Sequence, residues 1–264
     1  MFLYLLLAVL VIFLGWWFTR HPSNDRLWAD DVTHITSGTR DGNVITLNNV
    51  RNFNWRSLTD YDQVWETRHY KLDELASVDL FLSTWGKPLI AHTLISFGFT
   101  DGRYVAFSFE IRKERGEKFS EIAGFFKQYE LALIASDEND IIRTRTNIRK
   151  EDVTMYRVQL NQEDREKLFL SYLERANELV EKPAFYNTLT ANCTTVIFQM
   201  MRVIVPSIPL DYRILVSGLL PSYIYDLGGF GQDTPLETLT EQGRITKKAQ
   251  QITDGENYSD VIRR

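Results

Sequence analysis

The chain has 264 residues, of which 44% are hydrophobic and 25% are charged, and its formal net charge is −5. This length can bury one substantial core, or a core with a small appendage, and the composition is that of an ordinary globular domain. The negative charge, without a basic patch or an RNA-binding aromatic motif, argues against nucleic acid as a partner. Aromatic residues make up 13% of the chain, a share that favours β-structure or an apolar binding surface.

The N-terminus carries an uncharged apolar stretch, residues 2–18, that is just long enough to span a bilayer as a helix. Trp16 and Trp17 stand at its end, where an aromatic belt would lie. A signal peptide would have a basic segment before the apolar one and an Ala-x-Ala cleavage site, and this sequence has neither. We therefore expect residues 1–20 to be an uncleaved membrane anchor and residues 21–26 a linker. The flanking charges leave the orientation of the anchor open.

Strand patterns recur through the first part of the chain after the linker. Short strands with turns are expected at 32–55, and the clearest single strand candidates are 44–47, 91–99, 104–111, 125–134 and 153–160. The segment 73–82 has no clear period and is expected to be weakly helical or irregular. The charged connection 137–150 is expected to form a solvated face, and the alternative is a basic edge near anionic headgroups.

The second part of the chain reads as helical. Asn161 caps an amphipathic helix whose apolar stripe ends at Leu179, and Pro183 follows. After a second apolar helix comes a Gly- and Pro-punctuated segment. The predicted domain extends over 27–230. The polar tail, 231–264, is expected to be loosely packed or disordered.

The strongest hairpin signal is the pair of strands around Asp101-Gly102. One face is apolar on both strands and consists of Ile95, Phe97, Phe99, Val105, Phe107 and Phe109. These side chains share a side only if the loop has an odd number of residues, about three. The other face then carries His92 roughly opposite Glu110, with Ser108 nearby. A carboxylate in that position holds an imidazole in one tautomer, and a solvated polar face is the alternative interpretation.

The chain has a single cysteine, Cys193. A lone thiol cannot form an internal disulfide, and one sulfur is too few for a structural zinc site. Asn192 is a good N-cap, which places Cys193 in the first turn of the following helix, where free N–H groups and the helix dipole stabilise a thiolate. A buried structural cysteine is the alternative. The sequence has no phosphate loop, HExxH motif or metal-ligand cluster, so we expect no metal and no cofactor.

The order of strand histidine, strand carboxylate and helix-start cysteine is the reverse of the papain order. It predicts an α+β fold, a circularly permuted papain-like domain with an antiparallel sheet packed against helices. In such a site His92 takes the thiol proton, Cys193 attacks an ester or amide carbonyl, and Glu110 orients His92.

Three further residues are candidates for substrate binding. Arg51 can bind a phospholipid phosphate bidentately, and the alternative is a salt bridge with Asp60 or Asp62. Tyr186 can line the pocket or donate to an oxyanion, and the alternative is a packed core tyrosine. Asn192 adjoins the thiol.

Several motifs taken together resemble the Lnb-type N-terminal periplasmic domain of bacterial membrane proteins; they are residues 92–102, 108–112, 186–195, 48–53 and 258–264. The resemblance extends from about Asn24 onward. It implies a permuted papain-like, NlpC/P60-related domain that faces the periplasm or the cell exterior. Members are associated with lipoprotein N-acylation through a cysteine acyl intermediate. By this resemblance His92 and Cys193 carry over as the catalytic pair, with Glu110 as the third member.

These observations lead to one main functional hypothesis. The chain is expected to be a cysteine-dependent acyltransferase or hydrolase of the bacterial envelope, anchored in the inner membrane by a single pass through residues 2–18. Its substrate would be a membrane lipid or a lipoprotein. Members with established acyltransferase activity carry more membrane-embedded sequence than this chain. A shared domain with a different substrate is therefore an alternative. The alternatives are a cell-wall peptidase or amidase of the same fold and a non-catalytic envelope binding domain. The sequence leaves the oligomeric state open.

Overall fold

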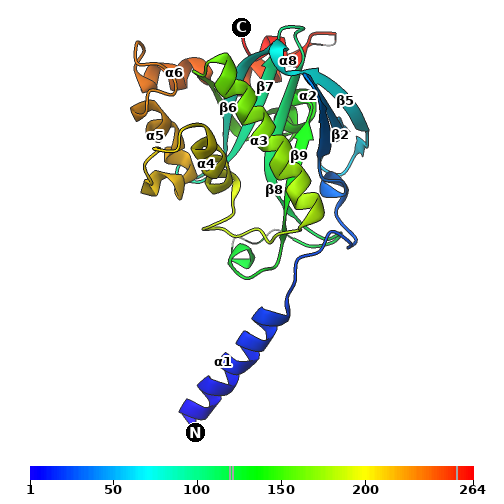
Figure 1. Cartoon of the computed structure of the whole chain (residues 1–264), viewed down its shortest axis with the longest axis vertical. Helices are drawn as coiled ribbons and strands as arrows, with labels where there is room; N and C mark the ends of the chain where they lie inside the picture. Colours follow the sequence, from blue (N-terminus) through cyan, green and yellow to red (C-terminus); the bar gives the residue numbers. More distant parts are fainter. Residues whose placement is uncertain (119, 121, 254) are drawn as a thin grey trace.

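A mostly antiparallel sheet lies at the centre of the computed structural model, which describes residues 1–118, 120, 122–253 and 255–264 (Figure 1). Among these residues the sheet has eight strands in the order β1-β2-β9-β8-β7-β6-β10, with β5 paired to β2 off this path. Of the described strand pairs, only β2–β9 is parallel. The strands are β1 (Ser37–Asp41), β2 (Val44–Arg51), β5 (Trp65–Lys71), β6 (Leu75–Thr84), β7 (Ala91–Phe99), β8 (Tyr104–Arg112), β9 (Glu130–Ser136) and β10 (Asp152–Val158). A separate small hairpin consists of β3 (Asn54–Trp55) and β4 (Tyr61–Asp62).

Helices cover both faces of the sheet. On one face α3 (Gln162–Glu181) and α4 (Cys193–Ile204) share a core with the apolar side of the hairpin. On the other face lie α2 (Glu138–Arg143), which continues as a π-helical turn (Thr144–Ile148), α7 (Thr246–Gln250) and α8 (Tyr258–Val261). The remaining helices are α5 (Leu220–Asp226) and α6 (Leu236–Gly243), and short 3₁₀ turns occupy 30–32, 72–74, 123–125, 212–214 and 217–219. The predicted α+β architecture is confirmed.

The N-terminal helix α1 (Phe2–Thr19) stands away from the domain (Figure 1). None of its residues is buried, and it is long and apolar enough to cross a membrane. An isolated helix that exposes apolar side chains all round is not stable in water, but it matches the environment of a bilayer. The helix therefore fits the predicted membrane anchor.

The predicted register of the hairpin is confirmed. Leu94 pairs with Ser108 and Phe97 with Val105, and the amide of Phe99 donates to the carbonyl of Arg103. The loop between that pair has three residues, 100–102. The six apolar side chains named above are all buried in one core, as the alternation predicts.

The predicted helix after Asn161 is also confirmed. The Asn161 side chain accepts a hydrogen bond from the amide of Asp164, and α3 ends just before Pro183. Its buried side chains include Leu168, Phe169 and Tyr172, which pack against the hairpin.

Two segments expected to be irregular are regular. Residues 75–84 form the inner strand β6, between β7 and β10. Because helices cover both of its faces, the side chains on both sides are buried, with Val78, Leu80 and Leu82 on one face and Asp79, Phe81 and Ser83 on the other. Phe81 on the otherwise polar side interrupts the alternation in the sequence. The tail after Gly231 is not disordered: it forms α6, α7 and α8, and Ile245 and Ile262 are completely buried. Its few apolar residues are far apart in sequence but gather on the second face of the sheet.

Two further expectations need correction. The charged connection 137–150 is not a solvated face, because Glu138, Asp140 and Arg145 are buried in α2 and the π-helical turn. Each is held by an oppositely charged partner, which is how buried charges are tolerated. The strand expected at 125–134 begins only at Glu130, because 123–125 is a 3₁₀ turn.

Candidate active site

The central hairpin opens at the end away from its loop. β7 and β8 pair from the loop only as far as Leu94 and Ser108. Beyond this pair, β7 remains hydrogen-bonded to β6 as far as Ala91, and β8 remains hydrogen-bonded to β9 as far as Arg112. Helix α4 contacts both strands, and its first residue, Cys193, lines the same cavity as His92 and Glu110. The topology therefore brings a helix N-terminus between the strands that carry His92 and Glu110.

The start of α4 is fixed by a capping box. The side-chain oxygen of Asn192 accepts hydrogen bonds from the amides of Thr194 (2.9 Å) and Thr195 (2.8 Å), and the Thr195 hydroxyl accepts one from the amide of Asn192 (2.9 Å). The Asn192 amide group also donates to the carbonyl of Thr188 (2.6 Å). The predicted N-cap is confirmed. Its bonds hold Cys193 as the first residue of the helix.

His92 and Glu110 meet as the hairpin register requires. The Nε2 atom of His92 lies 3.2 Å from the Glu110 carboxylate and 2.6 Å from the Ser108 hydroxyl. The same hydroxyl donates to Glu110 at 2.7 Å. The Cys193 thiol lines the same cavity as this imidazole, close enough for the charge of each to shift the pKa of the other. A thiol, an imidazole and a carboxylate thus form one connected set.

The charges of this set shift three pKa values. Burial raises the pKa of the Cys193 thiol, but the His92 charge, aided by the Thr93 amide, outweighs it, and the pKa lies below its usual value. Burial and the nearby Arg145 lower the pKa of His92, but Glu110 and Cys193 raise it more strongly, so that the net shift is upward. Burial raises the pKa of Glu110, whereas His92 and Arg145 bring it well below its usual range. These directions favour a thiolate–imidazolium pair beside an ionised carboxylate.

A second layer of charges supports Glu110 from the second face of the sheet. Arg145, in the π-helical turn, donates to Glu110 at 3.3 Å and to Glu151 at 3.0 Å. Glu151 in turn accepts a hydrogen bond from the Ser83 hydroxyl at 2.5 Å. The sequence pattern did not reveal Arg145 or Glu151, because a run of alternating charges looks the same whether it is solvated or paired inside.

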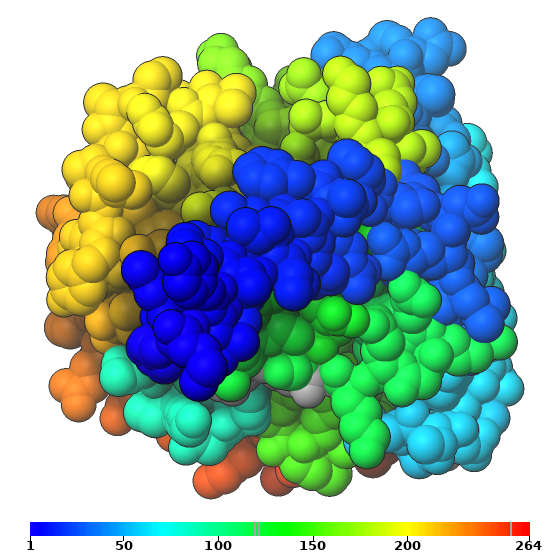
Figure 2. All heavy atoms as spheres, turned by 90° about the horizontal axis from the view of Figure 1, so that it is seen from below, coloured from blue at the N-terminus to red at the C-terminus, as the bar shows by residue number. Residues whose placement is uncertain are grey.

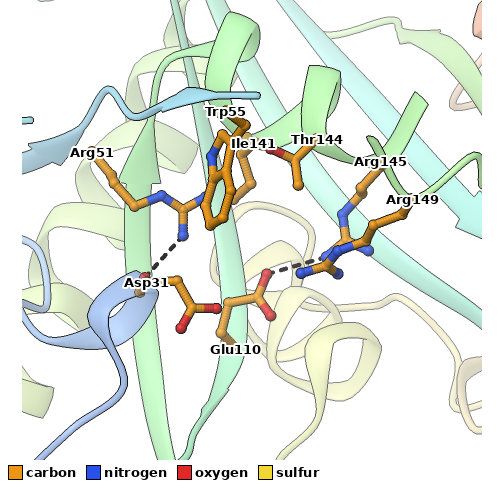
Figure 3. Close-up of a pocket in the computed structure, with 8 residues that line it drawn as sticks. All are labelled: Asp31, Arg51, Trp55, Glu110, Ile141, Thr144, Arg145 and Arg149. Atoms are coloured by element: carbon orange, nitrogen blue, oxygen red, sulfur yellow. Dashed lines mark hydrogen bonds and ion pairs between the residues drawn. The ribbon is translucent and has the colours of Figure 1, made fainter. Parts of the chain in front are cut away.

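Arg51 lines a small cavity of about 20 Å³ together with Glu110, Arg145 and Arg149 (Figure 3). Its guanidinium makes two hydrogen bonds to the Asp140 carboxylate, at 2.8 and 3.0 Å, and one to the carbonyl of Asp31 at 2.9 Å. It does not line the larger cavity that holds Cys193. The structure therefore brings Arg51 near Glu110 but not into the cavity of the other candidate residues, and its role in substrate binding stays a prediction.

A cavity of about 1050 Å³ opens from the thiol. Cys193, His92, Glu110, Tyr186 and Asn192 all line it. Most of its remaining wall is apolar and includes Trp85, Leu89, Ile90, Phe109, Phe125 and Val216. Burial, together with the negative charges of Cys193 and Glu110, raises the pKa of Tyr186, so that its hydroxyl stays a hydrogen-bond donor.

Residues 61–218 match the model of the Lnb N-terminal periplasmic domain family. The match covers more than half of the chain and includes the thiol, imidazole and carboxylate described above, and the chain therefore belongs to this family. No curated protein and no solved structure matches the chain. The periplasmic domain and the apolar helix α1 together indicate a single-pass membrane protein of the cell envelope.

Proposed function

We propose that this member of the Lnb N-terminal periplasmic domain family is a cysteine-dependent acyl-transfer enzyme, anchored in the bacterial inner membrane, that takes acyl groups from lipids or lipoproteins. The observation that carries the proposal is the position of Cys193, beside His92, in the wall of a large and mainly apolar cavity. An activated thiol in an apolar cavity suits a substrate whose reacting carbonyl ends a hydrocarbon chain.

The first half-reaction starts from the Cys193 thiolate beside the His92 imidazolium, which holds the proton of the thiol. The thiolate attacks the ester carbonyl carbon, a C–S bond forms, and the carbonyl electron pair moves onto oxygen. The Cys193 amide, the first of α4, and the Tyr186 hydroxyl would donate to that oxyanion. When the intermediate collapses, the C–O bond breaks and His92 gives its proton to the departing alkoxide. A thioester on Cys193 remains.

The second half-reaction returns the enzyme to its starting state. An amine or a water molecule attacks the thioester, His92 takes the proton of that nucleophile, and the C–S bond breaks to release the thiolate. Glu110 stays ionised throughout, since its pKa is well below its usual range, and it stabilises the imidazolium formed in each half. Glu110 is thus a positioning residue, whereas His92 and Cys193 carry the chemistry.

The size and lining of the cavity favour lipid over peptide substrates. Its volume of about 1050 Å³ is slightly above the roughly 300–1,000 Å³ that small-molecule pockets usually have. A muropeptide would call for polar groups along the whole groove. Here most of the exposed wall is apolar, and the charged lining residues include the cations Arg149 and Lys113, which suits a lipid with an anionic headgroup.

The test is intact-mass spectrometry of the full chain in detergent after incubation with bacterial phospholipids. Wild type would be compared with Cys193→Ser, with His92→Ala, and with His69→Ala, a matched control because His69 pairs with Thr46 away from the cavity. We expect a hydroxylamine-labile acyl adduct on wild type and His69→Ala but not on the other two variants. If no adduct forms while Cys193 is alkylated rapidly in a His92-dependent manner, the acyl donor is wrong and a peptidase or amidase is favoured. A slowly alkylated thiol would refute the enzyme proposal.

A further inference from the structure

Large apolar side chains are exposed on two loops at the open end of the hairpin. The loop between β6 and β7 exposes Trp85, Leu89 and Ile90, and the loop between β8 and β9 exposes Ile122, Phe125 and Phe126; these six residues are called the apolar rim below. Ile122 is 70% exposed and Phe126 43%. Contiguous apolar patches on soluble surfaces are rare, and they mark an interface with a protein, a ligand or a membrane.

The second of these loops is attached to the end of α1. The Lys127 ammonium donates to the carbonyl of Trp17 at 2.9 Å and lies 4.7 Å from the centre of its ring. Phe126 packs edge to face against Phe13 of α1, with the ring centres 6.4 Å apart. Figure 2, which views the molecule from the α1 side, shows the segments of both loops beside the helix, one in teal and one in green.

This attachment sets the depth of the loop relative to the membrane. Phe13 lies six residues before the last residue of α1, Thr19, which is about 9 Å along the helix at 1.5 Å per residue. Since α1 is the candidate membrane span, a side chain that contacts Phe13 reaches below the end of the apolar helix. Lys127, one residue farther on, is then level with Trp17, where the ammonium group and indole rings meet lipid headgroups.

The apolar rim also surrounds the mouth of the cavity. Trp85, Leu89, Ile90 and Phe125 are exposed to solvent and at the same time line the cavity that holds Cys193. The exposed patch, the cavity and the anchor are therefore one continuous region of the molecule. A site that only required a tether could face in any direction.

We propose that the apolar rim inserts into the periplasmic leaflet of the membrane that α1 spans, so that the cavity opens directly into the bilayer. Ile122 and Phe126 reach the acyl-chain region and Lys127 stays among the headgroups. A lipid tail then passes from the leaflet into the cavity without crossing water. The docking itself depends only on the anchor and the rim, and not on the proposed acyl transfer.

The experiment measures the depth of single labelled positions in the full chain. Because Cys193 is the only cysteine, a Cys193→Ser background accepts one new cysteine at a time for an environment-sensitive fluorophore. The positions are Ile122→Cys, Phe126→Cys and Val44→Cys. Val44 is a matched control because it is also apolar and is 38% exposed. It is the first residue of β2 and pairs with Lys71, near the loop of the hairpin and away from α1.

Each labelled protein is reconstituted into phosphatidylethanolamine–phosphatidylglycerol vesicles, with circular dichroism as the folding check. At Ile122 and Phe126 we expect a shift of emission to shorter wavelength, several-fold stronger quenching by acyl-chain nitroxides than at Val44, and weak quenching by aqueous iodide. If both positions behave like Val44, the rim lies in water and the proposal fails. It also fails if both are shielded from iodide but not quenched by lipid nitroxides, because a protein, such as a second copy, then covers the rim. Ile122 decides the matter if Phe126→Cys does not fold.

Discussion

Replacing Arg51 by methionine would decide between a structural and a substrate-binding role for this arginine. Arg51 is 5% exposed, and its partner Asp140 is completely buried. Asp140 also accepts hydrogen bonds from the Trp55 indole (2.7 Å) and the Phe53 amide (2.9 Å). The substitution leaves the carboxylate buried with these two neutral donors but without its cation. Removing one partner of a buried ion pair costs about 3–5 kcal/mol of unfolding free energy.

The control for this substitution is present in the same sequence. Arg56 makes paired hydrogen bonds of similar length to Asp60 and Asp62, but all three side chains are about half exposed or more. Ion pairs in water contribute little to stability, so Arg56→Met should leave the protein nearly as stable as wild type. Both variants lose an arginine and gain a methionine, so only the burial of the ion pair differs.

The assay is thermal unfolding of the full chain in mild detergent, followed by circular dichroism. At about 2–4 °C per kcal/mol for a domain of this size, Arg51→Met should lower the melting temperature by roughly 6–20 °C. Arg56→Met should barely change it. Equal melting temperatures for the two variants would refute this reasoning. If Arg51→Met were as stable as wild type but bound anionic phospholipid less well, the phosphate-binding role would be favoured instead.

Three further predictions concern the charges around Glu110 and the C-terminal segment. Glu110→Gln should lower the pKa of His92 and Arg145→Gln should raise it, because the Glu110 carboxylate raises that pKa and the Arg145 guanidinium lowers it. NMR titration of labelled histidines measures both shifts, and shifts of the same sign would contradict these two electrostatic roles. Because the pKa of Glu110 is lower in the folded protein than its ordinary value of about 4.3, its ionisation stabilises the fold above that pH. The difference in stability between wild type and Glu110→Gln should therefore be full near pH 7 and shrink as the pH falls below about 4, which acid unfolding curves would show. Ile245→Ala, in the segment expected to be disordered, should cost about 2–5 kcal/mol in chemical unfolding; no measurable change would mean that α7 does not pack as described.

The parts of the site that could be predicted depend on local rules. The alternation of apolar residues fixes which side chains share a face, and from it followed the odd loop and the pairing of His92 with Glu110. Asn192 is followed by an apolar run, and this pattern predicted the helix start at Cys193. Neither inference required knowledge of distant segments.

The parts that could not be predicted depend on contacts between distant segments. Arg145 meets Glu110 across 35 residues of sequence, and Arg51 meets Asp140 across 89. Nothing local distinguishes Arg51, which is buried, from Arg56, which is exposed and has acidic residues four and six positions away. A salt bridge with Asp60 or Asp62 was the alternative for Arg51, and only the fold shows that Arg56 makes it and that Arg51 pairs with Asp140 instead.

The position of Arg263 bears on how the protein is made. Its guanidinium bonds to Asp79 in β6 and to Glu138, the first residue of α2, both completely buried. Helix α2 leads directly into the turn that carries Arg145. The support of the site therefore includes a residue synthesised well after the thiol, and a nascent chain that already contains Cys193 has not yet completed that support. Until Arg263 has been synthesised, the buried carboxylate of Glu138 lacks this cation, and α2 lacks the side chain that links it to β6.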